Sequence, residues 1–365
     1  MVKSVTPEIL ISPLDWGLGH ASRCIPIIRE FLSNGANVTI AASGRSLNFL
    51  KKEFPDLQFI DLPGFSPTYS SSGKMLFKMM SLIPQFIYYL ISENLQISKI
   101  IKLRKFDLII SDNRYGVFNK KVKSVIIIHQ IRIKAPKQLQ WIEPLLFSVN
   151  KFLLIPFKEV WIPDYPSGEN LSGDLSHNIP VPDGTVYIGP LSRFMSTASD
   201  KINRKHGEYI LILLSGQEPQ RTILEKSILQ QVHKVPENFV MVQGIPEASG
   251  IKKDGNIRIL SHVLSQEAES LILNSKLIIC RPGYSTIMDL DILGAKAMFI
   301  ATPGQTEQEY LAEYYYNSGI ALSVKQEDID LRTQIPLAYQ FTGFQKRQKT
   351  ALLTEKIQKI LLTIS

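Results

Sequence analysis

A histidine and an aspartate follow two apolar runs in the first half of the chain, and both could move a proton. His20 comes soon after the run Glu8 to Ser12, and Asp112 comes directly after the run Leu108 to Ser111. Histidine titrates near neutral pH and is the most frequent general base, and a carboxylate can serve the same purpose. His20 is therefore our first choice for a general base and Asp112 our second. The alternative for His20 is a polar residue at a helix start with no catalytic task.

Two glycines precede this histidine in a loop that leads from a predicted strand into a predicted helix. Gly17 and Gly19 permit a tight turn and a close approach of a ligand, and a helix N-terminus attracts negative charge. A complete dinucleotide fingerprint would place a third glycine where Ser22 stands, so the glycine pair is a weak signal by itself. The loop is a candidate ligand-binding segment.

A second junction between a strand and a helix runs from Cys280 to Asp289. Gly283 allows backbone N–H groups to approach a ligand, and Ser285 or Thr286 can cap the helix or bond a phosphate. The carboxylate of Asp289, about one turn into the helix, can accept hydrogen bonds from both hydroxyls of a ribose. The alternative is that this carboxylate only favours the helix dipole.

Two further loops after predicted strands carry polar side chains. After the strand Tyr209 to Leu214, a loop with a cation at its end could cradle a diphosphate; its residues are Ser215, Gly216, Gln217 and Arg221. After the strand Ala297 to Ala301, a loop offers partners for sugar hydroxyls; its polar residues are Gln305, Gln308 and Glu309. For the latter loop the alternative is a solvated helix start rich in glutamate. Arg193 is another candidate cation.

Apolar strands alternate with helix-length segments in both halves of the chain. The predicted strands are Glu8 to Ser12, Val38 to Ala42, Leu57 to Leu62, Leu108 to Ser111, Val125 to His129, Tyr209 to Leu214, Phe239 to Gln243, Ile257 to Leu260, Leu277 to Cys280 and Ala297 to Ala301. This alternation predicts parallel sheets with helices on both faces, and ligands bind beyond the carboxyl ends of such strands. We expect an α/β protein with two Rossmann-like domains whose sheets face each other across a cleft.

A segment rich in Pro, Gly, Ser and Asp separates the two halves, from Pro163 to Asp200. Such composition is typical of exposed connections and of a domain boundary. We place the boundary near Gly189 to Phe194, which gives an N-terminal domain over 1–188 and a C-terminal domain over 189–345. The remaining residues, 346–365, are predicted to form a C-terminal helix. One arrangement for this helix is to pack back on the N-terminal domain.

The bulk composition narrows the class of protein. The 365 residues exceed the usual size of one hydrophobic core, and 20% charged residues is an ordinary globular content. Two cysteines cannot form a disulfide framework, and no apolar run reaches the ~18 residues of a spanning helix. The net charge of +8 suits acidic ligands or anionic membranes. Without zinc-ligand spacing or an RNA-binding aromatic motif, nucleic acid is not the favoured partner. We expect a cytoplasmic protein, with contact at the inner face of the membrane as an option.

The four loops together resemble those of glycosyltransferase family 28. This group has the GT-B architecture and includes the bacterial enzyme that adds N-acetylglucosamine to the lipid-linked peptidoglycan precursor. The resemblance covers both domains and is best over residues 17–35 and 281–319. It implies a nucleotide-sugar donor held by the C-terminal domain and an acceptor bound by the N-terminal domain. The segments 112–116, 129–130 and 171–177 have no counterpart that we can match, which indicates an uncharacterised bacterial branch.

The resemblance also implies roles for individual residues. Gly17, Gly19 and His20 match the loop that faces the cleft, and Arg193 matches an arginine that reaches the donor diphosphate. Asp289 matches an acidic residue that binds the ribose and is usually glutamate. Gln308 matches the first of two glutamines that contact the donor sugar, and Glu309 replaces the second, which leaves the sugar open. The backbone near Val263 matches the segment that reads the base, uracil in this family. The full predicted donor set is Arg193, Ser215, Gly216, Gln217, Arg221, Val263, Gly283, Tyr284, Ser285, Thr286, Asp289, Gln305, Gln308 and Glu309.

Two segments of the N-terminal domain are candidates for the acceptor pocket. One contains Asn113 and Arg114, and the other contains His129. The alternative for the first is turn chemistry. The segment Lys74 to Lys105 holds six basic residues and one glutamate among many apolar ones, so it could lie on an anionic membrane. The alternative for this segment is a core helix with a solvated face.

These observations predict a glycosyltransferase that moves a sugar from a nucleotide-sugar to a glycan or a lipid-linked acceptor. A UDP-sugar such as UDP-N-acetylglucosamine is the first candidate for the donor. A single displacement would invert the anomeric carbon, with Arg193, Arg221 and helix N-terminal amides stabilising the leaving diphosphate and with no metal ion or cofactor. Two rivals stay open, because fold alone does not choose among functions. They are a nucleotide-sugar epimerase of the same fold and a non-catalytic subunit that binds a nucleotide-sugar or a membrane partner.

Overall fold

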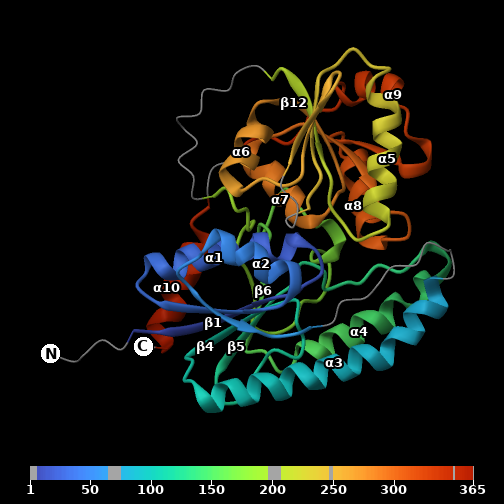
Figure 1. Cartoon of the computed structure of the whole chain (residues 1–365). Coiled ribbons are helices and arrows are strands. Elements are labelled where there is room, and N and C mark those ends of the chain that lie inside the picture. The colour runs from blue at the N-terminus through green and yellow to red at the C-terminus, as the bar shows by residue number, and fades with distance from the viewer. Residues whose placement is uncertain (1–5, 65–74, 196–206, 246–249, 348–349, 365) are drawn as a thin grey trace. The chain divides into compact units, whose positions relative to one another are not determined.

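The chain folds into two compact α/β units, each of which is considered by itself (Figure 1). The computed structural model describes residues 6–64, 75–195, 207–245, 250–347 and 350–364, and the side chains of 75–82 lie outside this description. The N-terminal unit contains the described residues up to Ser192 together with those from Thr350 onward. The C-terminal unit contains the described residues from Arg193 to Arg347.

The N-terminal unit is built on a sheet of seven parallel strands in the order β3-β2-β1-β4-β5-β6-β7. The strands are β1 (Glu8–Pro13), β2 (Asn37–Ala42), β3 (Gln58–Asp61), β4 (Leu108–Asp112), β5 (Lys123–Ile127), β6 (Glu159–Ile162) and β7 (Thr185–Tyr187). Strands β1 and β4 are buried almost throughout, which explains why their sequences are continuous apolar runs without polar alternation.

Helices cover both faces of this sheet, with α1 and α2 on one face and α3 and α4 on the other (Figure 1). The helices are α1 (Leu18–Ser33), α2 (Gly44–Glu53), α3 (Met75–Leu103), α4 (Glu143–Leu154) and α10 (Leu352–Ile364). The last of these returns to the N-terminal unit, where the ammonium group of Lys356 lies 2.6 Å from a carboxylate oxygen of Glu159. None of the described helices combines the length and the apolar character that a bilayer crossing requires.

The C-terminal unit repeats the plan with the strand order β10-β11-β9-β8-β12-β13-β14. The strands are β8 (Tyr209–Leu213), β9 (Phe239–Val242), β10 (Ile251–Asp254), β11 (Ile257–Leu260), β12 (Ser275–Cys280), β13 (Ala297–Ala301) and β14 (Leu322–Lys325), and β10 alone among them pairs antiparallel. The helices are α5 (Gln220–Val232), α6 (Ser265–Leu273), α7 (Tyr284–Leu293), α8 (Thr306–Asn317) and α9 (Leu331–Ala338). Apolar side chains of α5 and α9 join those of the central strands in one core cluster.

In each sheet there is a reversal point, at which the chain stops adding strands on one side of its first strand and begins adding them on the other side. In the N-terminal unit this point lies between β1 and β4, and in the C-terminal unit it lies between β8 and β12. Loops that leave the carboxyl ends of two such strands run in opposite directions and leave a crevice, which is where open α/β sheets bind ligands. These two positions decide which sequence-predicted residues can meet.

The predicted α/β class with two parallel sheets is confirmed, although several boundaries differ. Helix α1 begins at Leu18, earlier than the apolar periodicity indicates, because Gly19 is part of its first turn and Gly17 is the residue before it. Strands β6, β7, β10 and β14 were not predicted, since all four are short, three of them form sheet edges, and β6 lies next to an edge. Within the described residues, the division between the two units falls at Arg193.

Candidate active site

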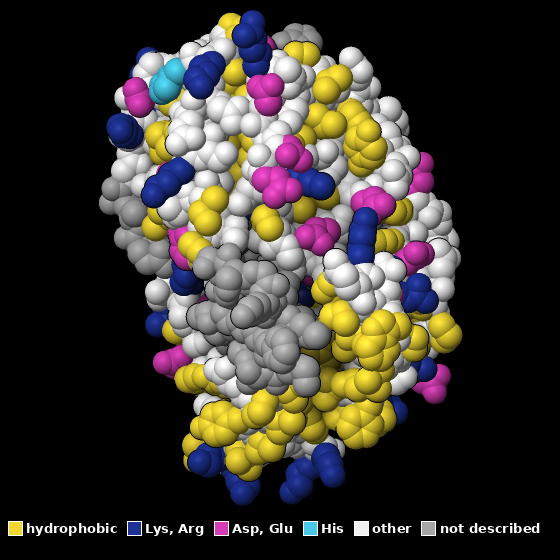
Figure 2. Space-filling model, turned by 90° about the vertical axis from the view of Figure 1, so that its right-hand side faces the viewer, with side chains coloured by type: hydrophobic (Ala, Val, Ile, Leu, Met, Phe, Trp, Pro, Cys, Tyr) yellow, Lys and Arg dark blue, Asp and Glu magenta, His cyan; other side chains and the backbone are white. Residues whose placement is uncertain are grey.

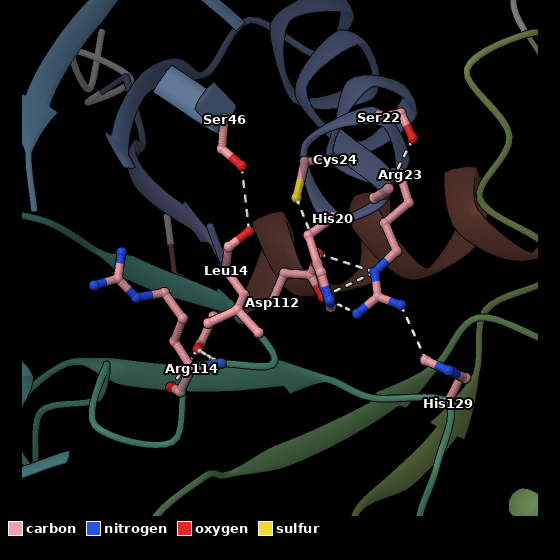
Figure 3. A network of polar contacts seen from close by, with 11 residues as sticks. Leu14, His20, Ser22, Arg23, Cys24, Ser46, Asp112, Arg114 and His129 are labelled. Atoms are coloured by element: carbon pink, nitrogen blue, oxygen red, sulfur yellow. Dashed lines mark hydrogen bonds and ion pairs between the residues drawn. The ribbon is translucent and has the colours of Figure 1, made fainter. Parts of the chain in front are cut away.

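His20 and Asp112 meet at the reversal point of the N-terminal sheet. His20 lies in the first turn of α1, just after β1, and Asp112 ends the neighbouring strand β4. The imidazole Nδ1 of His20 lies 3.3 Å from Oδ2 of Asp112 (Figure 3). The carboxylate is fully buried, whereas the imidazole retains 14% of its exposure. The two residues predicted to handle protons therefore form one pair, with the histidine on the accessible side.

Arg23 completes this pair from the next turn of the same helix. Its Nε donates to both carboxylate oxygens of Asp112 at 2.9 Å, and its Nη2 donates to Oδ1. Its Nη1 lies 3.0 Å from Nδ1 of His129, which follows β5 (Figure 3). The thiol of Cys24 lies 3.7 Å from Oδ2 of Asp112. One buried guanidinium thus links the predicted base, its carboxylate and a predicted acceptor-side histidine.

The electrostatics of this group set the charge of each member near neutral pH. Burial alone would raise the pKa of Asp112, but the guanidinium of Arg23 and then His20 lower it to about 2. Burial, followed by the charge of Arg23, lowers the pKa of His20 below its usual value of 6.5, and Asp112 only partly opposes this. Burial raises the pKa of the Cys24 thiol. Asp112 is therefore an anion, and His20 is a neutral imidazole able to accept a proton.

Glycine and asparagine shape the two loops around this pair. Gly17, the residue before α1, has φ 85°, a conformation that L side chains rarely adopt, and Gly19 lies in the first turn. Asn113 has φ 57°, so the chain turns sharply after β4. This agrees with the turn role considered for the segment after Asp112, since asparagine tolerates the left-handed region better than most residues.

Arg114 points away from His20 and Asp112, although it was predicted for the acceptor side (Figure 3). Its guanidinium is buried, and it donates to Glu93 of α3 at 3.0 Å, to Ser12 at 3.2 Å and to the carbonyl of Pro63 at 2.9 Å. These contacts tie α3 to the sheet. The residue therefore has a structural task, because all three guanidinium nitrogens are bonded inside the fold.

In the C-terminal unit, two predicted donor residues come together. Nε of Arg193 lies 3.7 Å from Oδ2 of Asp289, which is in the second turn of α7 after β12. Arg193 also stacks over the ring of Phe194, with 4.9 Å from the guanidinium carbon to the ring centre. The cation predicted for the diphosphate and the carboxylate predicted for the ribose are neighbours.

The loop between β13 and α8 is held by the side chains that were predicted to contact the sugar. Oε1 of Gln308 accepts from the N–H of Thr302 at 2.9 Å, and Oε1 of Glu309 accepts from the N–H of Gly304 at 2.9 Å. Because the oxygen of Gln308 is used in this way, its NH₂ group is the part that can serve a ligand. Gln305 is the N-cap residue of α8, immediately before the first residue of the helix.

In the loop between β8 and α5, the cationic side chain of Arg221 pairs with carboxylates of the same unit. Arg221 donates to Glu218 at 2.7 Å and to Glu225 at 2.8 Å, and it is buried. Two carboxylates therefore neutralise the charge that was predicted for the leaving diphosphate. Gly216 has φ 103°, which only glycine adopts readily, and Ser215 and Gln217 flank it in the same loop.

The other predicted donor residues lie at the same carboxyl edge of the sheet. Gly283 stands directly before α7, whose N-terminus has no side-chain cap, and Ser285 and Thr286 are half-buried in its first turn. Tyr284 is buried, and so is Val263, which follows β11. A helix start next to a glycine, beside the β8–β12 reversal point, suits an anionic ligand.

Sequence reasoning missed two buried arginines. Arg23 is a charged residue within the apolar stretch of α1, three positions after His20 and therefore on the same helix face, which is the signal that could have found it. Arg281 follows β12 and is fully buried, and its Nη1 donates to the carbonyls of Ile300 and Ala301 at 2.9 Å each. Burial lowers the pKa of Arg281 to about 10. Arg281 holds the ends of β12 and β13 together beneath the predicted donor loops.

Comparisons with known proteins connect this geometry to an activity. Residues 185–363 match the pattern of the glycosyltransferase family 28 C-terminal domain. An uncharacterised glycosyltransferase of Methanosarcina acetivorans is 25% identical over 329 residues, which cover 83% of this chain and 81% of the relative. The UDP-N-acetylglucosamine–N-acetylmuramyl-(pentapeptide) pyrophosphoryl-undecaprenol N-acetylglucosamine transferase of Paraburkholderia xenovorans is 22% identical over 194 residues, 52% of this chain and 49% of that protein.

Solved structures of low sequence identity share the fold. The glycosyltransferase SnogD from Streptomyces nogalater matches with a TM-score of 0.62 at 14% identity and covers 100% of both chains. MurG from Acinetobacter baumannii matches with a TM-score of 0.57 at 13% identity, covering 98% of this chain and 99% of the other. Both neighbours have the GT-B architecture, so the predicted architecture is confirmed.

The imidazole of His20 is expected to titrate below pH 6.5, because burial and Arg23 both oppose its protonation. Asp112→Asn should lower the titration point further, since the carboxylate is the group that favours the protonated form. NMR of histidine labelled with ¹³C measures this, with the His20→Gln variant to assign the signal. A titration at or above 6.5 in the wild type would contradict the described electrostatics.

Proposed function

We propose that this glycosyltransferase uses a nucleotide-sugar donor, because residues 185–363 match the family 28 C-terminal domain. The similarity to glycosyltransferases favours sugar transfer over the epimerase and over the non-catalytic subunit. A UDP-sugar such as UDP-N-acetylglucosamine is the first candidate, and the acceptor is a hydroxyl of a glycan or of a lipid-linked sugar. The observation that carries the proposal is the histidine held by a buried carboxylate at the reversal point of the N-terminal sheet.

In the proposed reaction, His20 is the general base. Asp112 accepts the Nδ1–H of the imidazole, so the lone pair of Nε2 is the one that takes a proton. The acceptor hydroxyl loses its proton to Nε2 while its oxygen bonds to the anomeric carbon of the donor. The bond from that carbon to the diphosphate breaks, and the diphosphate oxygen keeps the electron pair. A single displacement of this kind inverts the anomeric centre.

Asp112 acts through His20 in this scheme and is not itself the base. Its carboxylate is fully buried and engaged by Arg23, so an acceptor does not reach it. Once His20 has taken the proton, the carboxylate stabilises the imidazolium and keeps the ring in place. This replaces the second choice of base made from the sequence with a positioning role.

We assign donor binding to the loops of the C-terminal unit. Arg193 supplies positive charge for the diphosphate, and Asp289 binds the ribose hydroxyls. The NH₂ group of Gln308 and the second carboxylate oxygen of Glu309 are offered to the sugar. The uncapped N-terminus of α7 adds backbone N–H groups for the leaving diphosphate. Arg221 is left out of this set, since its partners are Glu218 and Glu225.

Binding of one nucleotide should raise the melting temperature of the protein, because the ligand stabilises only the native state. A thermal-shift panel of UDP, GDP, TDP, CDP and their sugars measures this. Asp289→Ala should abolish the ligand-induced shift, whereas Asp328→Ala, at an exposed carboxylate of the same unit, should keep it. A shift of roughly 2–4 °C per kcal/mol of binding stabilisation is expected. If no nucleotide moves the melting temperature, the donor assignment fails.

His20→Ala should lower kcat/KM of sugar transfer by about 10²- to 10⁴-fold, the usual contribution of a general base. Donor binding by thermal shift should be unchanged, because the loss falls on the chemical step. His233→Ala is the matched control, since His233 is half exposed and lies in the other unit. Transfer by the His20 variant within a few-fold of wild type would rule out this base.

We further propose that the N-terminal unit lies against an anionic membrane through an apolar surface on α3, α4 and the turn before α4. On α3 this surface contains Ile83, Ile87, Tyr88, Ile91 and Leu95, and on the α4 side it contains Trp141, Leu145, Val149, Phe152 and Ile155, with exposures from 49% to 78%. The residues recur at intervals of three or four, so each helix presents one continuous apolar stripe to the outside. Figure 2 shows hydrophobic side chains gathered in the lower part of the view, with Lys and Arg side chains at their lower border.

Tyr115, which follows β4, contacts both helices. The ring of Tyr115 lies 6.3 Å from that of Phe86 on α3, and its hydroxyl donates to Asn150 on α4 at 2.7 Å. On the inner face of α3, Ile97 packs into the core and Glu93 pairs with Arg114. The inner face of α3 therefore packs on the sheet, as the core-helix alternative expects, while the apolar outer stripe supports the membrane proposal.

Charge supports a bilayer as the occupant of this surface. Lys99 continues the α3 stripe four residues after Leu95, and Lys102 and Lys105 are exposed beyond it. Lys137 is exposed ahead of α4. A basic rim around apolar side chains suits anionic headgroups and acyl chains together. The earlier part of the predicted segment, from Lys74 through Leu82, lies outside the described side chains.

The protein should co-float with vesicles made of equal parts phosphatidylcholine and phosphatidylglycerol, and less with phosphatidylcholine alone. Raising the salt from about 0.1 M to about 1 M should weaken binding, because it screens the lysines. Phe152→Glu should lower vesicle affinity at least about tenfold, given ~1.5–3 kcal/mol for burying such a side chain. Leu362→Glu, at a comparably exposed position on α10, should bind as wild type. A concentration-dependent dimer that Phe152→Glu abolishes, without vesicle binding, would instead assign this surface to a second copy of the chain.

A further inference from the structure

Arg23 holds a central position in the N-terminal unit that the proposed reaction does not yet explain. Its side chain is 2% exposed and reaches three groups at once, which are the two oxygens of Asp112 and Nδ1 of His129. These partners come from β4 and from the segment after β5, whereas Arg23 and His20 share helix α1. A buried arginine needs an anionic partner, and Asp112 is that partner.

The N–H groups of the Arg23 guanidinium determine which ring nitrogen of His129 carries the proton. Arginine has N–H donors and no acceptor, so Nδ1 of His129 must accept the bond from Nη1. A ring nitrogen that accepts carries no proton, which places the proton of neutral His129 on Nε2. The contact therefore requires the tautomer of His129 with its proton on Nε2.

The carboxylate determines the opposite tautomer in His20. An ionised carboxylate only accepts, so the 3.3 Å contact requires a proton on Nδ1 of His20 and leaves the lone pair on Nε2. This holds only while Asp112 is ionised, and the guanidinium that binds both of its oxygens keeps it so. No hydrogen bond to Nε2 of His20 occurs among the described residues.

We propose that Arg23 is a positioning residue that fixes the two histidines in opposite tautomers, His20 with its lone pair on Nε2 and His129 with its proton on Nε2. The role rests on the proposed function, in which the Nε2 atom of His20 takes the acceptor proton. The charged and titratable groups that face His20 are Arg23, Asp112 and His129, with the thiol of Cys24 against Asp112. Arg23 and Asp112 cancel each other, so the buried group carries no net charge while both histidines are neutral.

The planar shape of the guanidinium is what permits this arrangement. Nε and Nη2 address the carboxylate side by side, and Nη1 points to a third acceptor. Lysine would keep the charge but, as a single ammonium group, would not reproduce this fork. The two properties of Arg23, its charge and its geometry, can therefore be separated by substitution.

The test compares Arg23→Met and Arg23→Lys with the wild type by ¹⁵N and ¹³C NMR of labelled histidines, which reports the tautomer and the titration of each ring. His20→Gln and His129→Gln assign the signals. In Arg23→Met, His20 should gain about tenfold in proton affinity, because a nearby positive charge is lost. His129 should lose its single tautomer, and the acid limb of the pH profile for transfer should move upward with His20.

Arg23→Lys should keep the proton affinity of His20 within a few-fold of wild type, while His129 becomes a mixture of tautomers. Arg29→Met is the matched control on the same helix, where Arg29 is partly exposed and pairs with Glu53 at 3.6 Å. It should leave both histidines unchanged. If Arg23→Met does not fold, the lysine variant decides the question through His129.

The proposal is overturned if a folded Arg23 variant shows the wild-type tautomer of His129 and the wild-type titration of His20. Lowered transfer with both of these readouts unchanged would mean that Arg23 has only a structural role. The NMR readout needs no substrate. An absence of transferase activity would therefore refute the proposed function and still leave the tautomer assignment measured.

Discussion

A buried ion pair between Arg23 and Asp112 connects helix α1 to strand β4 in the N-terminal unit. Neither charge is accessible to water, so each is tolerable only in the presence of the other. The pair sits where the order of strands reverses, which is the position that leaves room for a ligand. The contact of His20 with Asp112 and its connection through Arg23 to His129 both depend on this pair. The proposed proton transfer therefore depends on a side chain that does not itself touch substrate.

The two units present different side chains at the corresponding position of one architecture. In the N-terminal unit, the reversal point holds a balanced group of charges with a histidine at its edge. In the C-terminal unit, the corresponding loops bond to themselves through Gln308, Glu309 and Arg221, and Arg281 holds the strand ends beneath them. Such loops are ordered before a ligand arrives, which reduces the entropy lost on binding.

The sheet of the N-terminal unit also supports a second surface through α3. Arg114, which follows β4, binds Glu93 and so anchors the inner side of this helix. The outer side carries the apolar stripe that we assign to a membrane. Strand β4 and its following turn thus contribute Asp112 to the proposed active site and Arg114 to the support of the proposed membrane surface. Adjacent residues serve separate purposes because the chain turns sharply at Asn113.

Local sequence patterns predicted the class of fold, the positions of most strands in both sheets and the loops that we propose as binding segments. These follow from local periodicity and from glycine-rich turns, which are properties of neighbouring residues. The sequence also indicated His20 and Asp112 separately. The folded chain adds that the two are partners and that Arg23, 89 positions before Asp112, joins them. It also adds that Arg114 and Arg221 form ion pairs with carboxylates inside the fold. Such pairings depend on which strands become neighbours, and no local pattern encodes that.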